Sequence, residues 1–111
     1  MLMQFVEANA DDPFPRYGLA MEFKNAGRLE DADRAFSELM NRFPDYTPAY
    51  LHAGNVARDL GRIDAAVAIY RAGVEACSRK RDEHAQGELE SALAAVQSTE
   101  SSKPQPGRGS V

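Results

Sequence analysis

Few side chains in this sequence could ligate a metal or act as a nucleophile. The 111 residues include one cysteine, Cys77, and two histidines, His52 and His84. Cys77 and His84 lie seven positions apart, which matches none of the usual zinc-ligand spacings. Gly-x-Ser-x-Gly, His-Glu-x-x-His and glycine-rich phosphate loops are absent. We therefore expect no catalytic residue, no cofactor and no metal site, and we interpret Cys77 as a small buried hydrophobic residue.

The charged clusters also have simple structural explanations. Acidic pairs at residues 11–12 and 30–31 are expected at helix starts, where the helix dipole favours negative charge. The basic run at residues 79–81 is expected at a helix end for the same reason. Thirteen Lys and Arg against seventeen Asp and Glu give a net charge of −4, which argues against a dedicated nucleic-acid binder. We expect that the protein is not an enzyme.

The sequence also carries signals about cellular location. Charged residues make up 27% of the chain and leave no run of ~20 apolar residues, the length that a membrane-spanning helix needs. The apolar start at residues 1–6 has no Lys or Arg before it and does not resemble a signal peptide. A single cysteine cannot form an intramolecular disulfide, which favours a reducing compartment. We predict a cytoplasmic protein without membrane contact.

Proline and glycine divide the chain into helices. The dipeptides Asp12–Pro13 and Thr47–Pro48 each join a candidate N-cap side chain to a proline at the first helical position. Gly27 and Gly61 are placed where helices are expected to end, and Pro44 ends another. No strand-like alternation appears, so the chain is predicted to be all-α. Helices are predicted near residues 1–10, 13–26, 29–43, 48–60, 63–79 and 82–97.

These helix signals recur with a fixed period. Gly27-Arg28 returns 34 residues later as Gly61-Arg62. The same shift places Ala32 on Ala66, and Phe36 on Tyr70. A period of this length is typical of stacked helical repeats.

The chain resembles the tetratricopeptide repeat (TPR) family, whose motif is W-x2-L-G-x2-Y, then A-x3-F, then P. In residues 13–46 the matching places hold Arg16, Leu19, Ala20, Phe23, Ala32, Phe36 and Pro44. In residues 47–80 they hold Tyr50, Ala53, Gly54, Ala57, Ala66, Tyr70 and Ser78. The resemblance implies a short right-handed α-solenoid of antiparallel helix hairpins. Small residues at Ala20, Gly54, Ala32 and Ala66 would let the paired helices approach closely.

The same phase divides the chain into five parts: an N-terminal half-hairpin helix (1–12), a first repeat (13–46), a second repeat (47–80), a capping helix (81–97) and a disordered tail (98–111). The capping helix carries an apolar stripe for the core: Ala85, Leu89, Ala92, Leu93 and Val96. Its other face is polar and is expected to meet solvent: Gln86, Glu88, Glu90 and Gln97.

The resemblance also implies a binding surface. In TPR proteins the first helix of each hairpin lines a concave groove that receives a peptide or a partner's helix. Helical spacing places ten residues on this face: Phe14, Tyr17, Met21, Lys24, Asn25, Leu51, His52, Asn55, Arg58 and Asp59. Some family members bind an acidic C-terminus through a lysine and an asparagine, but Tyr17 and Met21 stand at those places here. Lys24 and Arg58 occupy equivalent positions, so we expect a ligand with an apolar anchor and at least one carboxylate.

Two function classes follow. The favoured one is a monomeric adaptor that binds an unidentified protein or peptide in the groove. The alternative is a self-associating structural module that dimerises or stacks through its solenoid edges, because two full repeats are fewer than the ~three that a stable stack usually needs. A purely structural role for the groove residues is also open, since Tyr17 and Met21 could instead pack on residues 1–10.

Overall fold

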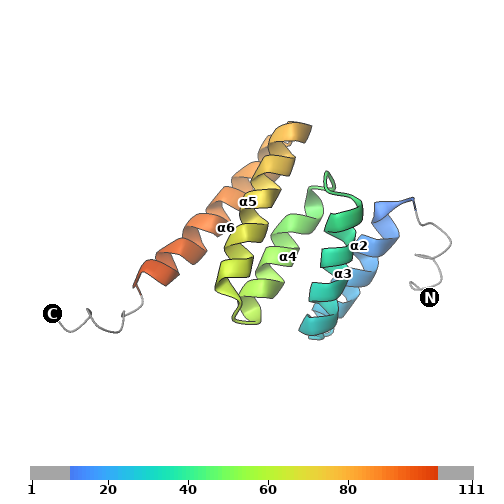
Figure 1. The fold of residues 1–111 in the computed structure, drawn as a ribbon, viewed down its shortest axis with the longest axis horizontal. Coiled ribbons are helices and arrows are strands. Elements are labelled where there is room, and N and C mark those ends of the chain that lie inside the picture. The colour runs from blue at the N-terminus through green and yellow to red at the C-terminus, as the bar shows by residue number, and fades with distance from the viewer. Residues whose placement is uncertain (1–10, 103–111) are drawn as a thin grey trace.

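A computed structural model describes residues 11–102, and within them the chain is entirely α-helical. The helices are α2 (Pro13–Asn25), α3 (Leu29–Arg42), α4 (Pro48–Asp59), α5 (Ile63–Lys80) and α6 (Glu83–Ser102) (Figure 1). The all-α prediction is therefore confirmed for this part of the chain. The helix predicted at residues 1–10 lies outside the described residues.

The helices pack as successive hairpins. α2 lies against α3, α4 against α5, and α6 against α5, while α3 and α4 join the two hairpins. α4 also contacts both α2 and α6, so these three helices form one layer, and α3 and α5 form the other. Figure 1 shows α2 and α6 at opposite ends of the row. This arrangement is the predicted short α-solenoid.

Helix α2 begins and ends as its sequence predicts. The Asp12 carboxylate accepts a hydrogen bond of 3.0 Å from the backbone N–H of Phe14, and Pro13 occupies the first helical position. Gly27 follows the helix with a φ of 77°, and Gly61 follows α4 with a φ of 81°. Only glycine takes this left-handed conformation without a steric penalty from Cβ.

The prediction that Thr47 caps α4 is wrong. Its side chain makes no capping bond to α4; its hydroxyl instead donates to Asp82 Oδ2 at 2.9 Å. Asp82 Oδ1 accepts from the backbone N–H of Ala85 at 3.2 Å, so Asp82 caps α6. The hydrogen bond from Thr47, and then that from Ala85, hold the pKa of Asp82 below its ordinary value. Thr47 therefore connects the starts of α4 and α6.

The boundary predicted at residue 97 is also wrong. Helix α6 continues to Ser102, five residues further. Extending a formed helix adds a hydrogen bond for each residue that is fixed, so a polar composition does not by itself stop it. The remainder of the predicted tail, residues 103–111, lies outside the described residues.

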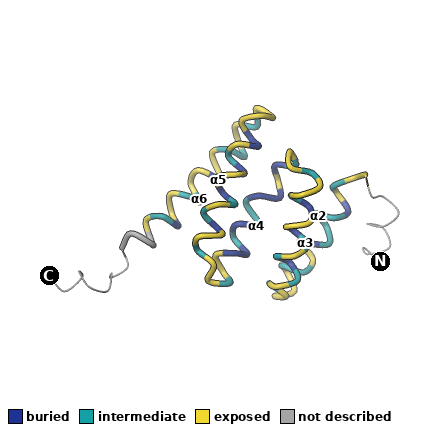
Figure 2. The backbone as a smooth tube through the Cα atoms, in the orientation of Figure 1, coloured by how far each residue is buried: buried dark blue, intermediate teal, exposed yellow. Residues whose placement is uncertain are grey.

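Small residues allow close packing between the layers, as predicted. Ala20, Ala32 and Ala66 are fully buried. A Cβ built on Gly54 would overlap the ring of Tyr70. Figure 2 shows buried segments alternating with exposed ones along the helices (Figure 2).

Cys77 is buried in the core, as the sequence analysis expected. Burial raises the pKa of its thiol, so the sulfur stays protonated and behaves as a small apolar group. None of the described helices is long and apolar enough to cross a membrane.

Candidate peptide-binding groove

Helices α2, α4 and α6 together border a hollow of about 130 Å3. Its lining residues are Tyr17, Thr47, Pro48, Leu51, His52, Ala85, Glu88 and Leu89. Three of the ten predicted groove residues, Tyr17, Leu51 and His52, are among them. The hollow is therefore built by the three helices of one layer rather than by a single helix.

The contribution of α6 was missed at the level of sequence. Ala85, Glu88 and Leu89 were assigned to a capping helix with a buried stripe and a solvent face. Because α6 packs on α5 and also contacts α4, it occupies the position that the first helix of a third hairpin would take. Asp82 caps α6 and binds Thr47, so it is the residue in the sequence that could have indicated that α6 starts beside α4.

An aromatic contact forms one wall of the hollow. The ring of Tyr17 meets Tyr46 edge-on, with centroids 5.5 Å apart and an interplanar angle of 61°. Tyr17 also lies 6.0 Å from the His52 ring at 56°. The Tyr17 phenol is neutral at pH 7, and burial raises its pKa further above the ordinary value of 10.0. These contacts fix the Tyr17 ring in place, so that it gives the hollow a rigid and mainly apolar wall.

His52 presents an uncharged ring. Burial lowers its pKa most, and the positive charge of Lys24 lowers it further, while Glu88 opposes the shift. The Nδ1 atom of His52 is buried and has no hydrogen-bond partner among the described residues. At neutral pH the imidazole therefore contributes no charge to the hollow.

Three predicted groove side chains, Asn55, Arg58 and Asp59, are already engaged within the chain. Asn55 Oδ1 accepts a 2.5 Å hydrogen bond from the hydroxyl of Tyr70, a residue of α5. Arg58 pairs with its neighbour Asp59 at 3.1 Å. None of Asn55, Arg58 and Asp59 lines the hollow.

The remaining four predicted residues lie along α2, outside the hollow. Met21 packs against the core formed by the first hairpin and α4. Lys24 is half-buried and Asn25 is exposed. Phe14 is 64% exposed and is the one large hydrophobic side chain that is exposed among the described residues. Phe14 precedes Tyr17 by one helical turn, so it extends the apolar surface of α2 beyond the hollow.

Glu88 is exposed, as expected for the polar face of α6, but it also borders the hollow. Its side chain is 51% exposed, yet it lines the hollow beside Leu51 and His52. His84 lies one turn earlier, with Nε2 3.8 Å from Glu88 Oε1, and forms an ion pair only when its imidazole is protonated. Glu88 is thus the charged group of the hollow.

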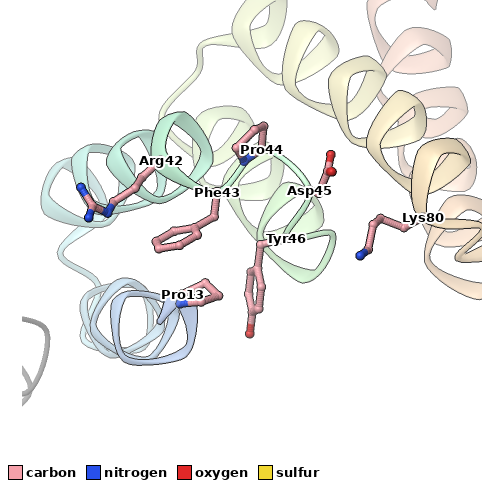
Figure 3. A pocket seen from close by; sticks show the side chains of 7 residues that line it. All are labelled: Pro13, Arg42, Phe43, Pro44, Asp45, Tyr46 and Lys80. Atoms are coloured by element: carbon pink, nitrogen blue, oxygen red, sulfur yellow. The ribbon is translucent and has the colours of Figure 1, made fainter. Parts of the chain in front are cut away.

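A second, larger hollow of about 370 Å3 lies at the loop between α3 and α4. Figure 3 shows its lining residues: Pro13, Arg42, Phe43, Pro44, Asp45, Tyr46 and Lys80 (Figure 3). Two of its charged groups have partners within the chain, because Arg42 pairs with Asp11 at 3.4 Å and Asp45 with Arg79 at 2.8 Å. Tyr46 contacts Tyr17, so its ring separates this hollow from the first.

Comparison with known proteins identifies the family. A family model described as tetratricopeptide repeat matches residues 47–79. A crystal structure of a tetratricopeptide repeat domain protein from Salinibacter ruber is 32% identical, with a TM-score of 0.74; the match covers 78% of this chain and 97% of that one. The chain belongs to the tetratricopeptide repeat family. A solution NMR structure of a TPR domain protein from the same organism is also 32% identical, with a TM-score of 0.75, covering 78% of this chain and 88% of that one.

More distant structures share the TPR fold alone. A MamA RS-1 double mutant is 15% identical, with a TM-score of 0.61 and coverage of 92% of this chain and 84% of that one. The type III secretion translocator chaperone SycD of Yersinia enterocolitica is 23% identical, with a TM-score of 0.55 and coverage of 94% and 86%. The comparison with curated proteins returned no match. Membership of the TPR family supports a protein-interaction module in general.

Proposed function

We propose that this TPR protein is a non-catalytic adaptor that binds a peptide or helix of a partner protein in the groove of α2, α4 and α6. The observation that carries the proposal is the apolar hollow to which all three helices contribute. Tyr17 and Leu51 offer aromatic and aliphatic surface to one inserted side chain, and Leu89 also lines the hollow but is almost fully buried.

The polar groups of the groove support the same use. Asn55 and Arg58 are engaged within the chain by Tyr70 and Asp59. Among residues 11–102 no group of three or more His, Cys, Asp or Glu side chains is placed to hold a metal ion. What the groove offers is shape and apolar area, the means by which grooves bind an amphipathic segment.

The proposal includes a setting for the protein. We place it in the cytoplasm, on the ground that Cys77 is a free buried thiol. The net charge of −4 supports a protein partner over a nucleic acid. A monomer is favoured because α6 covers the outer side of the second hairpin with a largely polar surface.

The test compares variants of two residues that line the hollow. Proteins captured from lysate by the wild-type chain are identified, and each is titrated against Ala85→Leu, which fills the hollow, and Tyr17→Ala, which removes one wall. Glu75→Ala, on the outer surface of α5, is the matched control. A partner that binds the control normally and both groove variants at least ~10-fold more weakly supports the proposal. Equal affinity for all four proteins would place the binding surface elsewhere.

Self-association is the second candidate, and the exposed Phe14 favours it, because a side chain 64% exposed at the first helix is a natural dimer contact. Light scattering over a concentration series separates the two functions. A constant monomer mass supports the adaptor. A mass that doubles with concentration in the wild type, but not in Phe14→Ser, supports the alternative.

A further inference from the structure

The charges around the hollow specify more about the partner than its shape does. Every lining residue other than Glu88 is uncharged at neutral pH, including His52, whose ring is kept neutral chiefly by burial. The Glu88 carboxylate offers acceptor oxygens only. His84, one helical turn earlier on α6, is largely exposed and pairs with this carboxylate only when its imidazole is protonated.

Two positive groups of the inward face, Lys24 and Arg58, do not line the hollow. Arg58 is bound to Asp59 at 3.1 Å, so its charge is balanced locally. Lys24 stands two helical turns beyond Tyr17 on α2, roughly 10 Å further along the helix at 1.5 Å per residue. The charge of Lys24 acts on His52, but Glu88 is the one charged residue among those that line the hollow beside Tyr17 and Leu51.

We infer that the segment bound in this groove carries a lysine or arginine next to its apolar anchor, and that Glu88 is the residue that selects it. The apolar anchor fills the hollow against Tyr17, Leu51 and Leu89, and the cation extends to the Glu88 carboxylate at the rim. This differs from the ligand expected from sequence, whose carboxylate was to meet Lys24 and Arg58. The inference rests on the proposed function, because it requires that the groove binds a peptide.

The expected size of the preference follows from the exposure of Glu88. A half-exposed carboxylate paired with one cation typically changes affinity by ~2–5-fold, and the effect weakens as salt screens the pair. Reversing the charge adds repulsion and enlarges the change. A preference of this size accumulates over several rounds of selection and appears as enrichment of basic residues in the selected peptides.

The experiment is a selection from a displayed library of random 12-residue peptides. The baits are the wild type, Glu88→Gln, Glu88→Lys, the hollow-filling Ala85→Leu, and Glu75→Lys as a control with the same charge reversal on α5. Each bait is first checked by circular dichroism for an unchanged helical spectrum and a cooperative melt. We expect the wild type and Glu75→Lys to enrich a large apolar residue with Lys or Arg within four positions. We expect Glu88→Gln to keep the apolar residue without the basic one, and Glu88→Lys to enrich Asp or Glu instead.

The outcomes separate this inference from the proposed function. An apolar motif that Ala85→Leu abolishes, but whose neighbouring charges are the same for all Glu88 variants, would overturn the inference and leave the groove as the binding site. No enrichment with any bait, or a motif that Ala85→Leu selects equally well, would overturn the proposed function itself. The titration of one enriched peptide at 50 and 300 mM salt completes the test, because the Glu88-dependent part of its affinity must shrink at the higher salt.

Discussion

At the scale of single residues, some side chains predicted to face the groove instead bind residues that are distant in the sequence. Asn55 and Tyr70 are 15 positions apart and meet only because α4 crosses α5. Helical spacing identifies which residues share a face, but it does not indicate which of them another helix has already engaged. The positions of Tyr17, Leu51 and His52 could be predicted because their side chains are large. All three are half-buried on the layer formed by α2, α4 and α6.

The lowered pKa of His52 predicts that the stability of the protein depends on pH. Its pKa is lower in the folded chain than the ordinary value of 6.5, so the unfolded chain binds the proton more readily. The stabilising contribution of the neutral ring is complete above about pH 6.5 and is lost as the pH falls through the lower folded pKa. Thermal melts between pH 7.5 and 5 should show the midpoint falling over this range.

The substitution His52→Asn should reduce that fall, because it removes the titrating ring. His84→Asn, which changes an exposed histidine outside the hollow, is the matched control and should retain it. An identical pH dependence for His52→Asn and the wild type would show that the ring is not held neutral by its surroundings. The effect of Asp82 does not interfere, because its pKa is lowered from 3.8 and its contribution is lost only in stronger acid.

At the scale of helices, the starts, ends and close crossings could largely be predicted. Glycine after a helix and proline at its first position act through local backbone geometry, which the sequence contains directly. The Thr47 hydroxyl does not accept from a backbone N–H of α4, as an N-cap would, because it donates to Asp82, which is 35 residues away in the chain. Helix α6 is longer than predicted because a helix that has formed propagates through polar residues.

The close crossing of α4 and α5 at Gly54 predicts that a larger residue there destabilises the fold. In Gly54→Ala the new methyl group overlaps the Tyr70 ring, so the ring must move and its hydrogen bond to Asn55 is strained. Overpacking of this kind lowers the free energy of unfolding by about 1–3 kcal/mol. Gly87→Ala is the control, because a Cβ there meets nothing within 4 Å and alanine favours a helix interior by ~1 kcal/mol over glycine. Urea unfolding of both variants checks the signs; a stabilised Gly54→Ala would contradict the packing described here.

At the scale of the whole molecule, stability comes from contacts between successive hairpins. Arg62 binds Glu30 at 2.7 Å and Asp33 at 3.2 Å, which joins the start of α5 to α3. These pairs are exposed and contribute little individually. The larger contribution is burial, and α6 supplies Leu89 and Val96, which are 1% and 5% exposed. The resemblance to TPR proteins predicted this layered arrangement, but it could not indicate that α6 would also serve the groove.

Removing α6 should therefore damage both stability and binding. A chain that ends after Lys80 loses Leu89 and Val96 from the core, at about 1.5–3 kcal/mol each, and loses one wall of the hollow. We expect a clearly lower melting temperature and lost cooperativity. The point variant Glu90→Ala, on the exposed side of α6, should melt like the wild type. Equal melting of the truncated and full-length chains would show that α6 is not part of the core.

The most direct test of the groove is an NMR titration with a peptide enriched from the displayed library. Backbone amide shifts of the uniformly 15N-labelled chain report where the peptide sits, without any mutation. The account predicts that the largest changes fall on Tyr17, His52 and Ala85, one from each of α2, α4 and α6, with small changes along α5. Largest changes at Phe43 and Lys80 instead would place the peptide in the hollow at the α3–α4 loop and contradict the groove as the binding site.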